Sequence, residues 1–169
     1  NLKAGLNGTK TFRAFVDATA QTIEVSETNN QAVLVYSVIT KPDVRITGIT
    51  LTPAVPSRGG EFDAKVTVRN IGSAPASNVL VSVWVNRPAV ATNNLNTNLD
   101  GSAPASATVG TIATNTSVLY TFTGLDAGTG TMARVCRAFA DSDLSLDEIL
   151  ETDNQRTIGY TPESRADFI

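Results

Sequence analysis

The sequence repeats itself once, at a constant spacing. Residues 13–17 (RAFVD) return as 137–141 (RAFAD), and residues 27–31 (ETNNQ) return as 151–155 (ETDNQ). The offset is the same in both cases, because 137 − 13 and 151 − 27 each give 124. The sequence therefore predicts the end of one repeat at 1–38, a complete repeat at 41–162 and the start of a third at 163–169. Large repeated modules are typical of architectural and binding proteins rather than of enzymes.

Short segments of alternating apolar and polar residues predict strands, and no segment has the period of a helix. In residues 61–70, Phe62, Ala64, Val66 and Val68 fall on one face. Further strands are expected at 44–51, 79–86, 107–112, 117–123, 131–140 and 155–160, with a bulge at Gly48 where the alternation slips. Seven short strands separated by Gly, Pro and Asn turns predict an all-β, two-sheet sandwich. Residues 1–38 supply only a β-hairpin, which needs other strands to cover it.

The composition argues against several classes of function. The net charge is −3 and no cluster of Lys or Arg occurs, so neither nucleic acid nor an anionic membrane is an expected partner. No apolar run reaches the roughly 18 residues of a membrane span. The chain has no His and no nucleophile or phosphate-loop motif, so we expect no catalysis and no required cofactor. Cys136 aligns with Phe12 in the other copy, which favours a small core side chain over an intermolecular disulfide or a reactive thiol.

Several groups of residues carry a resemblance to a known family. They are KPDVRI at 41–46, KVTVRNIG at 65–72, and RAFAD at 137–141 followed by EILETDN at 148–154; residues 15–30 repeat this closing pattern. Together they resemble the CARDB domain, the cell-adhesion-related domain found in bacteria and archaea. The resemblance implies a seven-stranded sandwich of the immunoglobulin or fibronectin type III kind, used in tandem in secreted and cell-surface proteins. Asp153, where the first copy has Asn29, and the long segment 87–106 depart from the family pattern.

The turn between the last two predicted strands is rich in carboxylates, and hard oxygen ligands at this density suit Ca²⁺, which binds six to eight oxygens. The candidate ligands are Asp141, Asp143, Asp147, Glu148, Glu151 and Asp153. Their spacing is not that of an EF-hand. Alternatively, the side chains cap the turn through local backbone hydrogen bonds. The first copy has Thr19 and Ile23 in place of Asp143 and Asp147, which favours a common structural role for the residues that both copies share.

Other candidate sites lie outside the acidic turn. Asn7 and Asn115 begin glycosylation sequons. Trp84 falls on the strand face opposite the valines, so it is either an exposed aromatic at an interface or a side chain covered by the polar segment 87–106. The candidate interface residues of the partial copy are Phe15, Val33 and Val35.

These features favour a non-enzymatic extracellular or cell-surface protein. We expect a stalk, an adhesin or a filament subunit built of modules joined end to end or by strand complementation. The expected partners are adjacent repeats or subunits, with a host-surface protein or glycan as a further partner. The alternative is a carbohydrate- or protein-binding accessory module of a larger secreted enzyme. A very long protein made only of repeats favours the first function, and a distinct appended domain favours the second.

Overall fold

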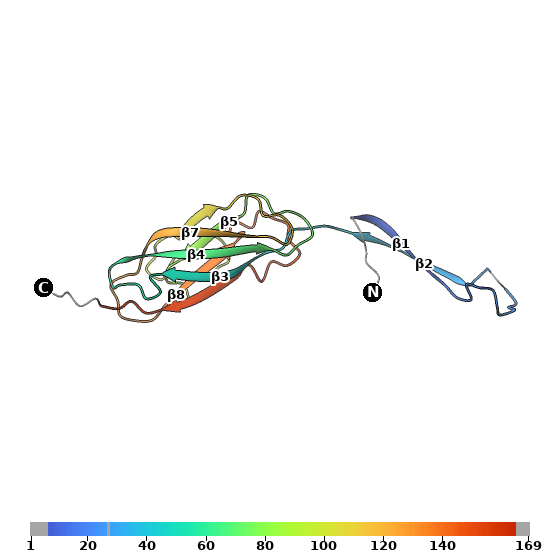
Figure 1. The fold of residues 1–169 in the computed structure, drawn as a ribbon, viewed down its shortest axis with the longest axis horizontal. Helices are drawn as coiled ribbons and strands as arrows, with labels where there is room; N and C mark the ends of the chain where they lie inside the picture. Colours follow the sequence, from blue (N-terminus) through green and yellow to red (C-terminus); the bar gives the residue numbers. More distant parts are fainter. Residues whose placement is uncertain (1–6, 27, 165–169) are drawn as a thin grey trace. The chain divides into compact units, whose positions relative to one another are not determined.

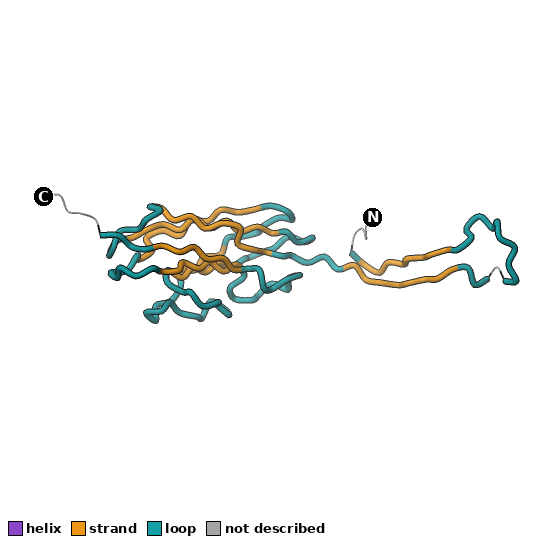
Figure 2. Tube along the Cα trace, turned by 90° about the horizontal axis from the view of Figure 1, so that it is seen from below, coloured by secondary structure: helices purple, strands orange, loops and turns teal. Residues whose placement is uncertain are grey.

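The computed structural model describes residues 7–26 and 28–164, and these residues form strands and loops without a helix (Figures 1 and 2). The chain divides into two units, Asn1–Thr40 and Lys41–Ile169. Of the strands in the described residues, two lie in the smaller unit and seven in the larger. The start of a third repeat, predicted at 163–169, lies outside the described residues from position 165 onward.

The larger unit is a sandwich of two antiparallel sheets. One sheet has the order β3-β4-β7 and consists of β3 (Val44–Thr52), β4 (Glu61–Asn70) and β7 (Ser117–Asp126), which lie side by side in Figure 1. The other has the order β6-β5-β8-β9 and consists of β5 (Leu80–Trp84), β6 (Ala105–Thr108), β8 (Arg134–Ala140) and β9 (Gln155–Tyr160). The predicted all-β, two-sheet sandwich of seven strands is confirmed.

The core lies between the two sheets, as the alternation in the sequence predicts. In β4, Phe62 is 2% exposed and Ala64, Val66 and Val68 are fully buried. The second sheet contributes Val81 and Val83, and Val79 just before β5 is buried with them. Burying a valine side chain stabilises the fold by roughly 1.5–3 kcal/mol, so this apolar face supplies much of the driving force for folding.

The strands begin and end close to their predicted positions, with one clear exception. The pairing of β3 with β4 shifts register between Ile46 and Gly48, as the slip in alternation predicts. The predicted strand 107–112 is instead β6 (Ala105–Thr108). Gly110 has a φ of +78°, a left-handed conformation that ends the strand, and Ile112 forms an isolated bridge to Ala76. The apolar Ile112 is therefore buried outside the sheet ladder.

A buried amide at the end of β4 holds the first residues of the larger unit in place. Oδ1 of Asn70 accepts hydrogen bonds from the backbone N–H of Gly72 at 2.9 Å and of Asp43 at 3.2 Å. Nδ2 donates to the carbonyls of Ala74 at 2.8 Å and Ile112 at 3.0 Å. Because both ends of the amide are satisfied, Asn70 is fully buried without an unpaired polar atom. The chain therefore enters β3 from a fixed position.

The smaller unit is a two-stranded antiparallel hairpin of β1 (Gly8–Phe15) and β2 (Gln31–Val38). Pairing runs from Gly8 with Val38 to Phe15 with Gln31. No residue of either strand is buried within the unit. An isolated two-stranded hairpin is at best marginally stable in water, so this unit has no core of its own.

Candidate metal centre and hairpin surface

Asp141 organises the acidic turn that follows β8. Its backbone has a φ of 52°, in the left-handed region that Asp tolerates, and the residue is fully buried. Oδ1 accepts a hydrogen bond from the backbone N–H of Ser145 at 3.1 Å, and Oδ2 accepts one from that of Leu146 at 3.3 Å. Such local bonds close turns. Asp141 therefore fixes the backbone of the turn, in agreement with the capping interpretation.

Glu148 and Glu151 extend the same turn toward the start of the module. Glu148 is 5% exposed, and its Oε1 accepts the backbone N–H of Val44, the first residue of β3, at 2.6 Å. Its Oε2 accepts a hydrogen bond from Nδ2 of Asn154. The exposed Glu151 accepts the backbone N–H of Glu148 at 3.1 Å. One carboxylate oxygen from each of Asp141, Glu148 and Glu151 lies within 4.8 Å of the other two.

Three buried oxygens around this turn have no hydrogen-bond partner. They are the Oδ1 atoms of Asp43, Asp153 and Asn154. Asn154 is 1% exposed and Asp43 is 7% exposed, so neither side chain is well solvated. Leaving a buried acceptor unpartnered costs about 1–3 kcal/mol. The turn thus combines carboxylates with acceptors that no protein donor satisfies.

Burial and mutual repulsion raise the pKa values of these carboxyl groups. Burial raises the pKa of Glu148 to about 7, and repulsion from Asp141 and Glu151 adds to the effect of burial. Burial likewise raises the pKa of Asp141 to about 6. The pKa of Asp43 is also raised, first by burial and then by repulsion from Asp153. The shifts have one common cause, which is negative charge concentrated where water is partly excluded.

The structure brings together part of the predicted calcium set. Asp141, Glu148 and Glu151 converge, whereas Asp143 and Asp153 lie beside them, close enough to raise the pKa values of Asp141 and Asp43. Asp147 does not join the cluster: its side chain is 84% exposed and forms an ion pair with Lys41. Asp147 therefore stands apart from the converging carboxylates, because the Lys41 ammonium holds its carboxylate, and its assignment as a ligand stays a prediction.

Two residues with unpartnered oxygens beside the cluster are Asp43, which the sequence did not suggest as a ligand, and Asn154, which was predicted as part of the oxygen-rich turn that both copies share. Asp43 lies at the start of the complete repeat, so its spacing from the acidic turn carries no local signal. The repeat itself carries one, because Asp43 recurs as Asp167 and Asn154 has its counterpart in Asn30 at the same 124-residue offset. Recurrence between repeats marks both residues, but it does not distinguish a ligand from a residue that closes the turn.

Trp84 is fully buried, so its prediction as an exposed interface residue is wrong. The segment 87–106 folds over it: Nε1 of Trp84 donates to the carbonyl of Asn96 at 2.7 Å, and the ring packs with Ala91 and Phe139. Gln155 holds the same segment by accepting the backbone N–H of Ala91 at 3.1 Å and donating to its carbonyl at 2.7 Å. The alternative, in which the long segment covers Trp84, is the observed one.

The hairpin pairs its strands in the register of β8 and β9. Phe15 lies opposite Gln31 just as Phe139 lies opposite Gln155, at the same offset of 124. A side-chain bond is also repeated. Nη1 of Arg13 donates to Oε1 of Gln31 at 3.0 Å, and the equivalent bond between Arg137 and Gln155 measures 3.1 Å.

The turn of the hairpin repeats the acidic turn of the larger unit. Asp17 has a φ of 48° and accepts the backbone N–H groups of Gln21 and Thr22, both at 2.9 Å. These are the equivalents of Ser145 and Leu146, which bond to Asp141. The backbone N–H of Val16 donates to the carbonyl of Asn30 at 2.8 Å, as that of Ala140 donates to Asn154 at 3.0 Å. Glu27, the counterpart of Glu151, lies outside the described residues.

Both faces of the hairpin carry apolar side chains. The predicted interface residues Phe15, Val33 and Val35 are 53%, 52% and 62% exposed, and their positions in the pairing place them on one face. The other face carries Phe12, Leu34 and Tyr36, which are 44%, 61% and 37% exposed. These three are the equivalents of Cys136, Ile158 and Tyr160, which are buried in the core of the larger unit or packed against it. Sequence reasoning missed this second face.

The two glycosylation candidates, Asn7 and Asn115, are both exposed.

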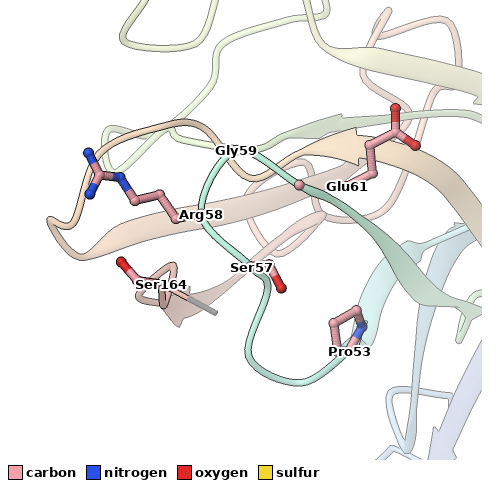
Figure 3. A pocket seen from close by; sticks show the side chains of 7 residues that line it. Pro53, Ser57, Arg58, Gly59, Glu61 and Ser164 are labelled. Carbon is pink, nitrogen blue, oxygen red and sulfur yellow. The ribbon is translucent and has the colours of Figure 1, made fainter. Parts of the chain in front are cut away.

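A separate hollow opens at the loop between β3 and β4, lined by Pro53, Ser57, Arg58, Gly59, Gly60, Glu61 and Ser164 (Figure 3). Its two ionisable side chains, Arg58 and Glu61, point apart, so its lining offers no acid–base pair. Glu163 is anchored here, since its carbonyl accepts the N–H of Arg58 at 2.8 Å and its N–H donates to Pro56 at 3.1 Å.

Comparisons with known proteins agree on the type of module. The CARDB family model matches residues 41–158. The CARDB domain of the PF1109 protein from Pyrococcus furiosus, crystallised in complex with di-metal ions, is 18% identical with a TM-score of 0.56, and the match covers 76% of this chain and 99% of that domain. A domain from Methanosarcina acetivorans, from a protein whose name assigns it to the cell surface, is 19% identical with a TM-score of 0.55, covering 76% and 97%. No curated protein sequence matches the chain. No helix in residues 7–26 and 28–164 has the length and apolarity of a membrane span.

Proposed function

Because the chain belongs to the CARDB family of cell-adhesion-related modules, we propose that it is a structural unit of an extracellular protein in which such modules follow one another in tandem. CARDB modules are non-catalytic and associated with cell surfaces. The proposed function is mechanical and adhesive: the module acts as a spacer or presents a binding surface. It does not transform a substrate.

The observation that carries this proposal is the equivalence of the hairpin with β8 and β9. In the larger unit, β8 pairs with β5 on one side and with β9 on the other, and the core lies beneath. The hairpin has the same register and the same turn, but its strands pair only with each other. Five strands equivalent to β3–β7, from a preceding module of the same polypeptide, would complete it. The hairpin is then the end of that module.

The face of the hairpin that carries Phe15, Val33 and Val35 supports the same assignment. In the larger unit, Arg137 donates from Nε to the carbonyl of Arg87 at 3.1 Å and from Nη2 to that of Pro88 at 2.8 Å, and Gln155 holds Ala91. The hairpin keeps Arg13 and Gln31 at the equivalent positions. The preceding module would therefore carry a covering segment like 87–106.

A covalent tandem is favoured over strand exchange between separate molecules. The larger unit already holds its own β8 and β9 in the sheet, paired over their length. A second copy could accept the hairpin only by releasing these strands and exposing Cys136, Ala138 and Tyr160, which are 0%, 0% and 6% exposed. Uncovering that core has a free-energy cost that pairing within one chain avoids.

The function is tested on the protein in its source cells. An antibody raised against residues 41–169 is expected to label intact, unpermeabilised cells, and the protein it captures is expected to have an intact mass far above 17.7 kDa, with peptide maps showing further repeats of this kind. Labelling that requires permeabilisation would contradict the surface function. A captured protein whose remaining mass is a catalytic domain would replace the structural role with the accessory-module alternative.

A further inference from the structure

We propose that the acidic turn of the larger unit binds one divalent cation of the calcium class, held by carboxylate oxygens of Asp141, Glu148 and Glu151 and by Oδ1 of Asn154. The site lies within a single module and does not depend on the tandem arrangement. It also extends the predicted ligand set, because Asn154 and the neighbouring Asp43 enter the argument from the structure.

The spacing of the three carboxylates suits one ion. Ca²⁺ binds oxygen at about 2.3–2.6 Å, so two oxygens on the same ion are at most roughly 5 Å apart. One oxygen from each of Asp141, Glu148 and Glu151 meets this limit, because the three lie within 4.8 Å of one another. The hydrogen bonds these groups accept do not prevent ligation, since a carboxylate oxygen has a second lone pair.

The unpartnered buried oxygens are an independent sign of a ligand. Asn154 donates through Nδ2 to Glu148, which places its amide in contact with the cluster, while its Oδ1 is buried without a donor. Oδ1 of Asp43 is also buried without a donor, and the negative charges of Asp153 and Glu151 repel the Asp43 carboxylate. Arg45 lies close enough to attract the Asp43 carboxylate, but no donor reaches either Oδ1 atom, and a bound cation would supply that missing partner.

The chemistry of the donors selects the kind of cation. Every donor is a carboxylate or amide oxygen, whereas zinc favours nitrogen and sulfur ligands. Mg²⁺ requires a near-ideal octahedron and gives up its water reluctantly, whereas Ca²⁺ accepts six to eight oxygens in irregular geometry. Five carboxyl groups gather here, from Asp43, Asp141, Glu148, Glu151 and Asp153. They outnumber the nearby cations, since Arg45 acts on Asp43 and the Lys41 ammonium is engaged by Asp147. The local field therefore favours a divalent cation.

Binding at this position would join the beginning of the module to its end. Glu148 already accepts the N–H of Val44, and the carbonyl of Pro42 accepts the N–H of Ile149 at 3.1 Å. An ion held by the turn would reinforce these contacts between the last turn and the first strand. The bound form should therefore melt at a higher temperature, by mass action on the folded state.

The test compares calcium binding in two variants of the 169-residue chain with matched charge changes. Glu151→Gln removes a ligand charge but keeps an Oε1 acceptor for the N–H of Glu148, so the fold is retained. Asp147→Asn makes the same charge change on the exposed carboxylate outside the cluster. After treatment with chelator, each protein is titrated with CaCl₂ and with MgCl₂ by calorimetry, and its melting is followed with and without calcium.

The wild-type chain and Asp147→Asn are expected to bind one calcium ion with similar Kd and to melt at a higher temperature with calcium than with magnesium. Glu151→Gln is expected to lose about tenfold or more in affinity. The proposal is overturned if millimolar calcium neither gives a binding heat nor moves the melting of the wild type, or if the two variants lose affinity equally. Near-ultraviolet circular dichroism checks that both variants fold. If Glu151→Gln does not fold, Asp153→Asn replaces it, because this change removes a charge beside the ligands, and it is expected to weaken calcium binding relative to Asp147→Asn.

Discussion

At the scale of single residues, turn closure explains part of the acidic motif that the two copies share. Asp17 and Asp141 share a left-handed backbone and the same two acceptor positions, so their conserved spacing within the chain is explained by turn closure. Turn closure leaves the Oδ1 atoms of Asn154, Asp43 and Asp153 without a donor. The sequence shows which acidic residues the turn contains, but not which of their oxygens already accept hydrogen bonds from the backbone. It therefore does not distinguish residues that close the turn from candidate ligands.

Cys136 is expected to behave as an inert core side chain. It is fully buried, and burial raises the pKa of its thiol from 9.0 to about 12. The thiolate is the reactive form. Iodoacetamide at pH 8 should leave the native chain unmodified and alkylate it in urea, as mass spectrometry would record. Because the folded pKa is raised, the stability tied to the neutral thiol is present below about pH 9 and is lost as the pH rises toward 12. Rapid alkylation of the native chain would contradict this assignment.

Gly72 is expected to tolerate no side chain. A Cβ at this position would overlap the backbone of residues 41–43, which cannot move without breaking the Asn70 network. Gly72→Ala should lower the free energy of unfolding by at least about 2 kcal/mol in urea denaturation. Gly130→Ala is the control, since its added Cβ would meet only the end of Arg134 at 3.6 Å, and it should change stability by less than about 0.5 kcal/mol. Equal effects would show that residues 41–43 can move.

At the scale of elements, strands were predictable and the long segment was not. The faces of β4 and the slip at Gly48 follow from a period of two, which burial on one face imposes. The path of residues 87–106 depends on long-range contacts, such as those of Trp84 with Asn96 and of Gln155 with Ala91, and no local pattern encodes them. For the same reason the sequence left open whether Trp84 is exposed or covered.

The covering segment is expected to loosen when its side-chain clamp is removed. Gln155→Ala removes both bonds to the backbone of Ala91 and one acceptor of Arg137, which should cost roughly 1–3 kcal/mol. The chain contains a single tryptophan, so its fluorescence reports on Trp84 alone. The emission maximum should shift to longer wavelength, and acrylamide should quench the fluorescence more strongly. Gln31→Ala, the equivalent change in the hairpin, should leave Trp84 emission unchanged. An unchanged spectrum in Gln155→Ala would show that the segment holds itself in place.

At the scale of the whole molecule, the offset of 124 residues accounts for a unit that has strands but no core. The hairpin keeps the register, the turn and the clamp residues of β8 and β9, yet exposes Phe12 and Leu34 at 44% and 61%. Folding physics does not favour such exposure in an independent body. We therefore interpret the hairpin as the closing part of a preceding CARDB module.

Amide hydrogen exchange on an extended chain tests this claim most directly. In the extended chain, a copy of residues 41–131, which contains β3–β7, is fused directly before residue 8. Residue 8 is equivalent to Met132, so the hairpin follows β7 at the same distance along the chain as β8 and β9 do in the complete module. We expect the amides of residues 12–16 to exchange rapidly in the 169-residue chain and to become protected by orders of magnitude in the extended chain, to the level of residues 136–140. Exchange at residues 12–16 that is as fast in the extended chain as in the original would contradict it.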